Sequence, residues 1–125
     1  MKFIFNDSKE NLVKFVYKNE SDIAFFEGNL GEILPLTDQN KILLGLGSKD
    51  DFDKDTLKKV IYDLGKFLSN KKVDQLSFEK QNVDLDDKDF ILTVAEAIEL
   101  ASYSFDYYKE ERYEFNINEI NFAKN

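Results

Sequence analysis

The sequence contains no cysteine and no histidine. The absence of cysteine excludes disulfide bonds, thiolate nucleophiles and sulfur-rich zinc sites. The absence of histidine removes the commonest metal ligand and the usual general base near neutral pH. Because the residue types that carry most catalytic and metal chemistry are missing, we expect this chain to contain no catalytic, metal-binding or cofactor-binding residue.

Basic residues are also scarce, with 17 Lys and Arg against 25 Asp and Glu, which gives a net charge of -8. An acidic surface repels the phosphates of nucleic acids and the headgroups of anionic lipids, so we expect neither as a partner. The apolar run in Met1–Asn6 is too short for a signal peptide, and no stretch reaches membrane-spanning length. These features predict a soluble, cytoplasmic protein.

Aromatic residues, by contrast, are plentiful, with 12 Phe and 6 Tyr in a chain that is 42% hydrophobic. Such a composition can supply a packed core and argues against disorder. The length of 125 residues is typical of one domain, which we assign to residues 1–125.

The central stretch Lys41–Asp50 organises the predicted fold. Ile42–Leu44 is an apolar run without alternation, which is typical of a strand buried on both faces. Gly45 and Gly47 then predict a sharp turn, because glycine adopts backbone conformations that other residues resist. An acidic cluster and an amphipathic helix follow. The stretch therefore predicts the crossover unit of an α/β domain.

Glycines between a strand and a helix also suggest a nucleotide-type ligand at the Gly45–Ser48 loop. A dinucleotide-binding motif needs a third glycine, however, and Asp50 occupies its position. The positive end of the helix dipole would attract an anion, but the aspartates at the start of the helix already place negative charges there. We therefore favour a purely structural turn, and ligand binding at Gly45–Ser48 is the alternative.

The apolar pattern predicts strands at Lys2–Phe5, Leu12–Lys18, Glu32–Leu36 and Val73–Phe78, and a last strand at Tyr113–Ile117 or Ile120–Phe122. Pro35 cannot donate to a strand ladder, so its strand is expected at a sheet edge. Thr37–Asn40 is predicted to join that strand to the central one as a tight hairpin. Ile23–Phe26 predicts either a short strand or one helical turn.

Two helices are expected, one from Asp53 to Ser69 with Asp53 as its N-cap, and one from Asp86 or Asp87 to a residue between Tyr103 and Tyr108. The apolar stripe of the first helix comprises Leu57, Val60, Ile61, Leu64, Phe67 and Leu68. Gly65 lies inside this helix, where it costs stability, so close packing is expected there.

Two acidic runs, Asp50–Asp55 and Asp84–Asp89, superficially resemble calcium-binding loops. Neither has the glycine and the glutamate that such a loop requires, and both lie at predicted helix starts, where the helix dipole favours carboxylates. We therefore interpret both runs as structural. The aromatic cluster Tyr103, Phe105, Tyr107 and Tyr108 could stack a ligand, but its position on a helix is more typical of core.

Three separated segments, Phe26–Glu32, Lys41–Gly47 and Glu96–Lys109, carry a resemblance to a known family. They resemble a Phe-x-Gly-Lys-x-Gly-Glu turn, a strand ending in Gly-Leu-Gly, and a helix ending in Leu-x-x-Tyr-x-Phe-Asp-x-Tyr-Lys. These motifs are those of the N-terminal domain of the leucyl (cytosol) aminopeptidase family. Asn29 stands where the family usually has lysine, and Asn19–Phe25 replaces a longer segment that contains a helix in the family.

This resemblance implies an α/β fold in which a mixed β-sheet is flanked by helices, similar to macro domains. It also implies a non-catalytic role in domain packing and homo-oligomer assembly, with the parent protein being a leucyl aminopeptidase, a metallopeptidase. The family's catalytic domain, with its two zinc or manganese ions, lies C-terminal to this region and has no counterpart up to Asn125. We therefore expect this chain alone not to be an enzyme. A plain protein-interaction domain is a further alternative.

Overall fold

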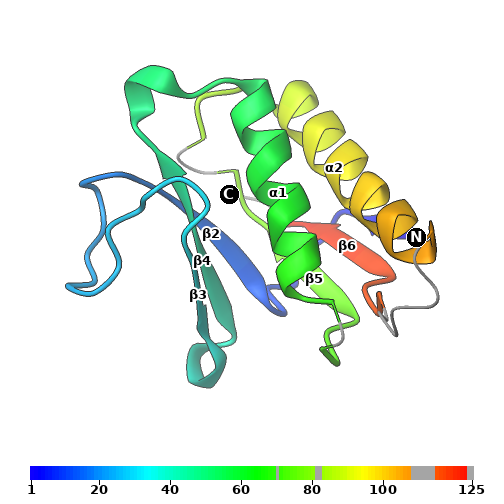
Figure 1. Ribbon diagram of the computed structural model, residues 1–125. Helices are drawn as coiled ribbons and strands as arrows, with labels where there is room; N and C mark the ends of the chain where they lie inside the picture. The colour runs from blue at the N-terminus through cyan, green and yellow to red at the C-terminus, as the bar shows by residue number, and fades with distance from the viewer. Residues whose placement is uncertain (70, 81–82, 108–114, 124–125) are drawn as a thin grey trace.

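The computed structural model describes residues 1–69, 71–80, 83–107 and 115–123, and of 104–107 only the main chain. One mixed sheet has the strand order β1-β6-β5-β2-β4-β3, and all neighbours are parallel except β3 and β4 (Figure 1). The strands are β1 (Lys2–Ile4), β2 (Leu12–Tyr17), β3 (Ile33–Leu36), β4 (Lys41–Gly47), β5 (Gln75–Phe78) and β6 (Glu119–Phe122). The helices are α1 (Lys54–Phe67) and α2 (Asp87–Tyr107), with short 3-10 turns at η1 (Thr37–Gln39) and η2 (Lys49–Asp51).

These elements confirm the predicted mixed α/β fold. The edge strand around Pro35, the hairpin at Thr37–Asn40 and both helices lie where the sequence places them. The last strand takes the Ile120–Phe122 alternative, while part of Tyr113–Ile117 lies outside the described residues. Ile23–Phe26 forms a turn, in which Phe26 N donates to the Ile23 carbonyl at 3.1 Å. Neither described helix has the combination of length and apolar sequence needed to cross a membrane.

One core fills the space between the sheet and both helices, which lie on the same face (Figure 1). Side chains alternate along a strand, so Val13, Phe15 and Tyr17 of β2 point toward the helices and are buried there. Strand β4 lies next to the edge strand β3 rather than at the centre of the sheet. It is nevertheless buried on both faces, as its unbroken apolar run predicts. The position of both helices leaves the second face of the sheet to be covered by connecting segments.

Helix α1 packs against the core through its predicted apolar stripe. Leu57, Val60, Ile61 and Leu64 of α1 are fully buried. Gly65 lies against α2 so closely that an added Cβ would stand 2.8 Å from Ala101 Cβ, which explains the glycine. The prediction was wrong for Phe67, which is 37% exposed, because its ring lies outside the core under Lys71 Nζ at 4.3 Å.

Asp53 is the N-cap of α1, as predicted. Its Oδ1 accepts hydrogen bonds from Thr56 N at 2.9 Å and Thr56 Oγ1 at 3.0 Å. These hydrogen bonds favour the ionised carboxylate and hold the pKa of Asp53 below its ordinary value, with the backbone donor as the larger cause.

Replacement of this cap is expected to give a pH-dependent loss. Because the folded-state pKa of Asp53 is lowered, its stabilisation is fully present above the unfolded pKa of about 3.9 and is lost as pH falls through the folded value. Urea melts should therefore give Asp53→Ala a lower free energy of unfolding than the parent at neutral pH. The difference between the two free energies should become smaller in acid. Asp53→Asn, which keeps an acceptor oxygen without a titrating group, is the control. A parent-to-alanine gap that is constant with pH would contradict this account.

The connection from β1 to β2 crosses the second face of the sheet. The crossovers through α1 and α2 run toward β1, whereas this one runs away from it, so the right-handed rule places it on the opposite face. Asn121 lies between the helix-facing Ile120 and Phe122, and its side chain therefore points to the second face. It accepts from Asn6 N at 3.0 Å and donates to the Ser8 carbonyl at 2.6 Å. Asn121 thus fixes the crossover to β6.

Candidate functional site

A crevice lies on the second face, beside the C-terminal half of β2. It exists because β5 ends at Phe78, which pairs with Val13, while β2 continues to Tyr17. The chain leaves β2 toward β3 and leaves β5 toward α2 and β6, so the connections diverge at this point. In α/β sheets, ligands characteristically bind outside the carboxyl ends of strands at such a switch point.

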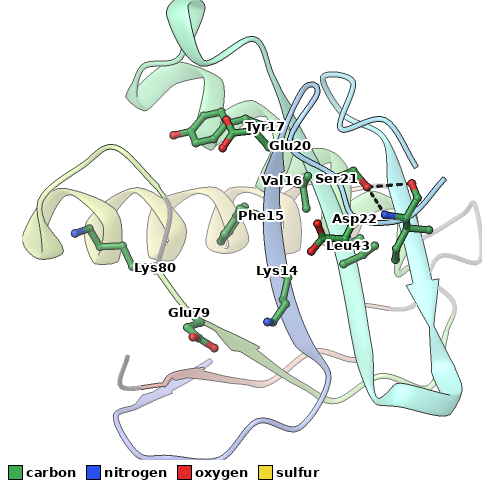
Figure 2. Close-up of a pocket in the computed structure, with 11 residues that line it drawn as sticks. Lys14, Phe15, Val16, Tyr17, Glu20, Ser21, Asp22, Leu43, Glu79 and Lys80 are labelled. Carbon is green, nitrogen blue, oxygen red and sulfur yellow. Dashed lines mark hydrogen bonds between the residues drawn. The ribbon is translucent and has the colours of Figure 1, made fainter. Parts of the chain in front are cut away.

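The crevice has a volume of about 210 Å³. Lys14 and Val16 of β2 and Leu43 of β4 contribute from the sheet, because they alternate with the residues that face the helices. Glu79 closes it from the segment after β5, and Asp22 from the segment after β2 (Figure 2). Charged groups of both signs therefore surround an apolar sheet surface.

A local turn holds the segment around Asp22, which closes the crevice after β2, in position. The Ser21 hydroxyl donates to the Ile23 carbonyl at 3.2 Å and accepts from Ile23 N at 3.0 Å (Figure 2). Both bonds span Asp22, so its carboxylate is presented from a closed local turn rather than from a freely moving chain.

Tyr17 forms another boundary of the crevice and is 2% exposed. Its Oη accepts a hydrogen bond from Asp84 N at 3.0 Å, which ties the end of β2 to the segment before α2. Burial raises the pKa of Tyr17, because desolvation disfavours the phenolate. The phenol is therefore neutral near physiological pH.

The structure corrects the predicted turn at Gly45 and Gly47, since both residues lie within β4. A Cβ at Gly45 would collide with the Asn29 carbonyl oxygen, and a Cβ at Gly47 would stand 3.1 Å from Leu30 Cβ. The glycines therefore admit the chain's own Gly28–Leu30 segment. The space where the alternative placed a nucleotide-type ligand, at Gly45–Ser48, is occupied on this side by that segment.

The two acidic runs lie at the starts of α1 and α2. Lys54 Nζ lies 3.8 Å from an Asp89 carboxylate oxygen, so an ion pair links the two helix starts. Among the described residues, no group of three or more acidic side chains is arranged to hold a metal ion. The geometry of the described aspartates is that of helix capping and surface charge.

Of the aromatic cluster of α2, only the side chain of Tyr103 lies within the described residues. Tyr103 is 66% exposed, so the prediction that it belongs to the core was wrong, because it lies on the outer side of the helix. The side chains of Phe105 and Tyr107, and all of Tyr108, lie outside the described residues.

Sequence reasoning did not single out Lys14, Asp22 or Glu79. One signal was available for Lys14, a charged residue in the middle of the otherwise apolar strand β2. A second was available for Glu79, which directly follows the apolar end of β5, where sites in parallel sheets occur. No pattern in the sequence points to Asp22, because its position depends on the fold of a connecting segment.

The strand order, the helices on one face and the crevice at the switch point define a mixed α/β domain. The chain belongs to the cytosol aminopeptidase family: the model of "Cytosol aminopeptidase family, N-terminal domain" matches residues 18–112. This range contains all three segments that carry the sequence resemblance, which is thereby confirmed.

Two solved structures of "Bottromycin maturation enzyme BotP", one in complex with Mn, are similar to this chain. Their TM-scores are 0.69 and 0.68, at 17% and 16% sequence identity. Both alignments cover 93% of this chain and 27% of the BotP chain, so this chain spans only that fraction of their length. At this identity the similarity supports the fold alone. No curated protein matches the sequence.

Proposed function

We propose that this chain is the non-catalytic N-terminal domain of a leucyl aminopeptidase-like metallopeptidase, and that it packs against the catalytic domain and supports assembly. The observation that carries the proposal is the family match over residues 18–112. The small share of the BotP chains that aligns with this domain agrees with a division between an accessory part and a catalytic part. The two metal ions and the hydrolytic residues belong, in this proposal, to the catalytic domain.

An aromatic groove supplies the contact surface for that domain. It has a volume of about 340 Å³ and is lined mainly by Phe5, Phe90, Ile91 and Phe122. Phe5 is 61% exposed, although its ring stacks on Phe122 with a centroid distance of 5.4 Å. Ala123, which directly follows β6, also lines the groove. Polypeptide continuing from β6 would therefore begin beside the groove.

The non-catalytic role predicts that the chain alone does not hydrolyse leucine p-nitroanilide, with or without added zinc or manganese. The physical reason is the complete lack of histidine and cysteine, together with the lack of any counterpart to the family's metal-binding signature. The measurement is release of nitroaniline by the purified chain. Turnover that survives repurification and follows the protein peak would contradict the proposal.

The packing role is tested by mixing the chain with a separately expressed cytosol aminopeptidase catalytic domain from the same genome. Size-exclusion chromatography with light scattering should show a complex. Phe5→Ser should weaken it by about tenfold or more, since an aromatic anchor at the centre of a contact carries much of its affinity. Phe25→Ser is the matched control, because Phe25 is 72% exposed and lies outside the groove. Equal weakening by both variants, or no complex, would contradict this role.

A further inference from the structure

Strand β1 leaves one edge of the sheet open. Its inner side pairs with β6, and no described strand pairs with its outer side. The Lys2 N–H donates to the carbonyl just before β6 at 2.7 Å, and the Asn6 N–H donates to Asn121 Oδ1 at 3.0 Å. Because main-chain groups alternate in direction along a strand, those of Phe3 and Phe5 point outward. Such an edge, with unpaired N–H and carbonyl groups, is a template for a further strand.

The apolar side chains of this edge are incompletely covered. Phe5 is 61% exposed, and Phe3 is half-buried against the core. Both rings stack on Phe122, with centroid distances of 5.4 Å for Phe5 and 6.4 Å for Phe3, so they lie on the helix side of the sheet. Ile4 alternates with them and points to the second face. The edge therefore offers apolar surface as well as main-chain groups.

The spacing of the outward groups fits a second copy of the same strand. In an antiparallel ladder, every second residue pair exchanges two hydrogen bonds. When Ile4 lies opposite Ile4 of the second copy, Phe3 lies opposite Phe5 of that copy, and Phe5 lies opposite its Phe3. Both of these pairs direct their main-chain groups toward the join, so two pairs with two bonds each can form. The edge is thus self-complementary about a two-fold axis.

The charges at this edge also fit a second copy. The chain has a net charge of -8, so two copies repel each other over most of their surfaces. The antiparallel alignment brings Lys2 of each copy to the Asn6–Asp7 segment of the other, so opposite charges meet at both ends of the pair. The Lys2 side chain is 72% exposed, and its contact with Glu119 is long, at 3.9 Å. Complementary charges favour this partner and this register.

We propose that two copies of this chain associate through the outer edge of β1, as antiparallel strands centred on Ile4. The two sheets then form one continuous sheet, and the Phe3 and Phe5 rings of one copy become cross-strand neighbours of those of the other, which stabilises the pair. The contact is short, so we expect a dissociation constant of about 10–100 µM. The pairing uses the main chain of β1 and needs no catalytic domain, so it stands or falls separately from the contact at the aromatic groove.

The mass of the unaltered chain at increasing concentration tests the proposal. Light scattering should give the 14.6 kDa of one chain in dilute solution and approach twice that value well above about 100 µM. Phe3→Pro should prevent the increase, because proline lacks the outward N–H while the N–H groups that face β6 remain. A parent chain that stays monomeric at about 0.5 mM would overturn the proposal and leave this edge to a strand of a different protein.

Charge substitutions at Ile4 test the two-fold register. Ile4→Lys and Ile4→Glu should each weaken association by at least about tenfold, because like charges then lie directly opposite each other. An equimolar mixture of the two variants should restore it, since opposite charges then meet. Leu30→Lys and Leu30→Glu are the matched controls, because Leu30 is 53% exposed and lies beside Gly47, away from β1.

The controls should associate like the parent. Ile4 variants that associate alone, a mixture that stays monomeric, or equal loss in the Leu30 variants would overturn the assignment to β1. If the Ile4 variants do not fold, as far-UV circular dichroism would show, the parent chain and Phe3→Pro decide.

Discussion

Gly45→Val is expected to abolish the folded state, or to lower the free energy of unfolding by more than about 3 kcal/mol. The added Cβ would strike the Asn29 carbonyl oxygen and stand 2.8 Å from the Gly28 carbonyl carbon. This backbone cannot move aside cheaply, because Gly47 N donates to the Gly28 carbonyl at 3.0 Å and Gly31 N to the Gly45 carbonyl at 3.0 Å. Urea melts of the variant against the parent measure the loss.

Substitutions at two other glycines distinguish a steric collision of the added Cβ from the strain of a left-handed backbone conformation. Gly31 has a φ of 81° and no described atom within 4 Å of an added Cβ, so Gly31→Ala should cost only the about 1–2 kcal/mol of a left-handed conformation. Gly47 combines a φ of 74° with a close neighbour, so Gly47→Val should lose more than Gly31→Ala. If Gly45→Val has the same free energy of unfolding as the parent, the Gly28–Leu30 segment can move aside to admit the side chain. That result would also restore the hypothesis of a ligand at Gly45–Ser48.

Ile61→Ala is expected to destabilise the chain by about 2–5 kcal/mol. Ile61 is fully buried between α1 and the sheet, and the neighbouring elements cannot close the resulting cavity without shifting a packed helix. The matched control is Leu92→Ala, which removes similar apolar volume from a helix position that is 49% exposed. Its effect should stay within about 0.5 kcal/mol, as for other surface substitutions. Similar midpoints for both variants would show that Ile61 is not part of the core.

The features that the sequence predicts correctly are those that depend on local patterning. The helical spacing of Leu57, Val60 and Leu64 fixes which side of α1 is buried, whatever it packs against. The cap at Asp53 needs only the backbone three residues on, so a short stretch contains both donor and acceptor. Likewise the unbroken apolar run of β4 implies burial on both faces without naming the elements that cover it.

The features that the sequence does not reveal depend on partners far along the chain. The sequence predicts a sharp turn at Gly45, but the glycine lies within β4 and is needed because Asn29 approaches it, which no local pattern contains. The crevice depends on β5 ending opposite Val13, and strand register is set by tertiary packing. Phe67 has the helical spacing of a core residue, yet it lies at the last turn of α1, where the core no longer faces it.

Strand β1 occupies the edge of the sheet, and its strand neighbour is β6, close to the other end of the sequence. The crossover after β1 is likewise fixed by Asn121, which bonds to Asn6 across 115 positions of sequence. During synthesis, β1 must therefore wait until almost the whole domain has left the ribosome before it can pair. Contacts of such long sequence separation are slow to form, because a large loop must close first. We infer that docking of β1 is a late folding event that closes the domain.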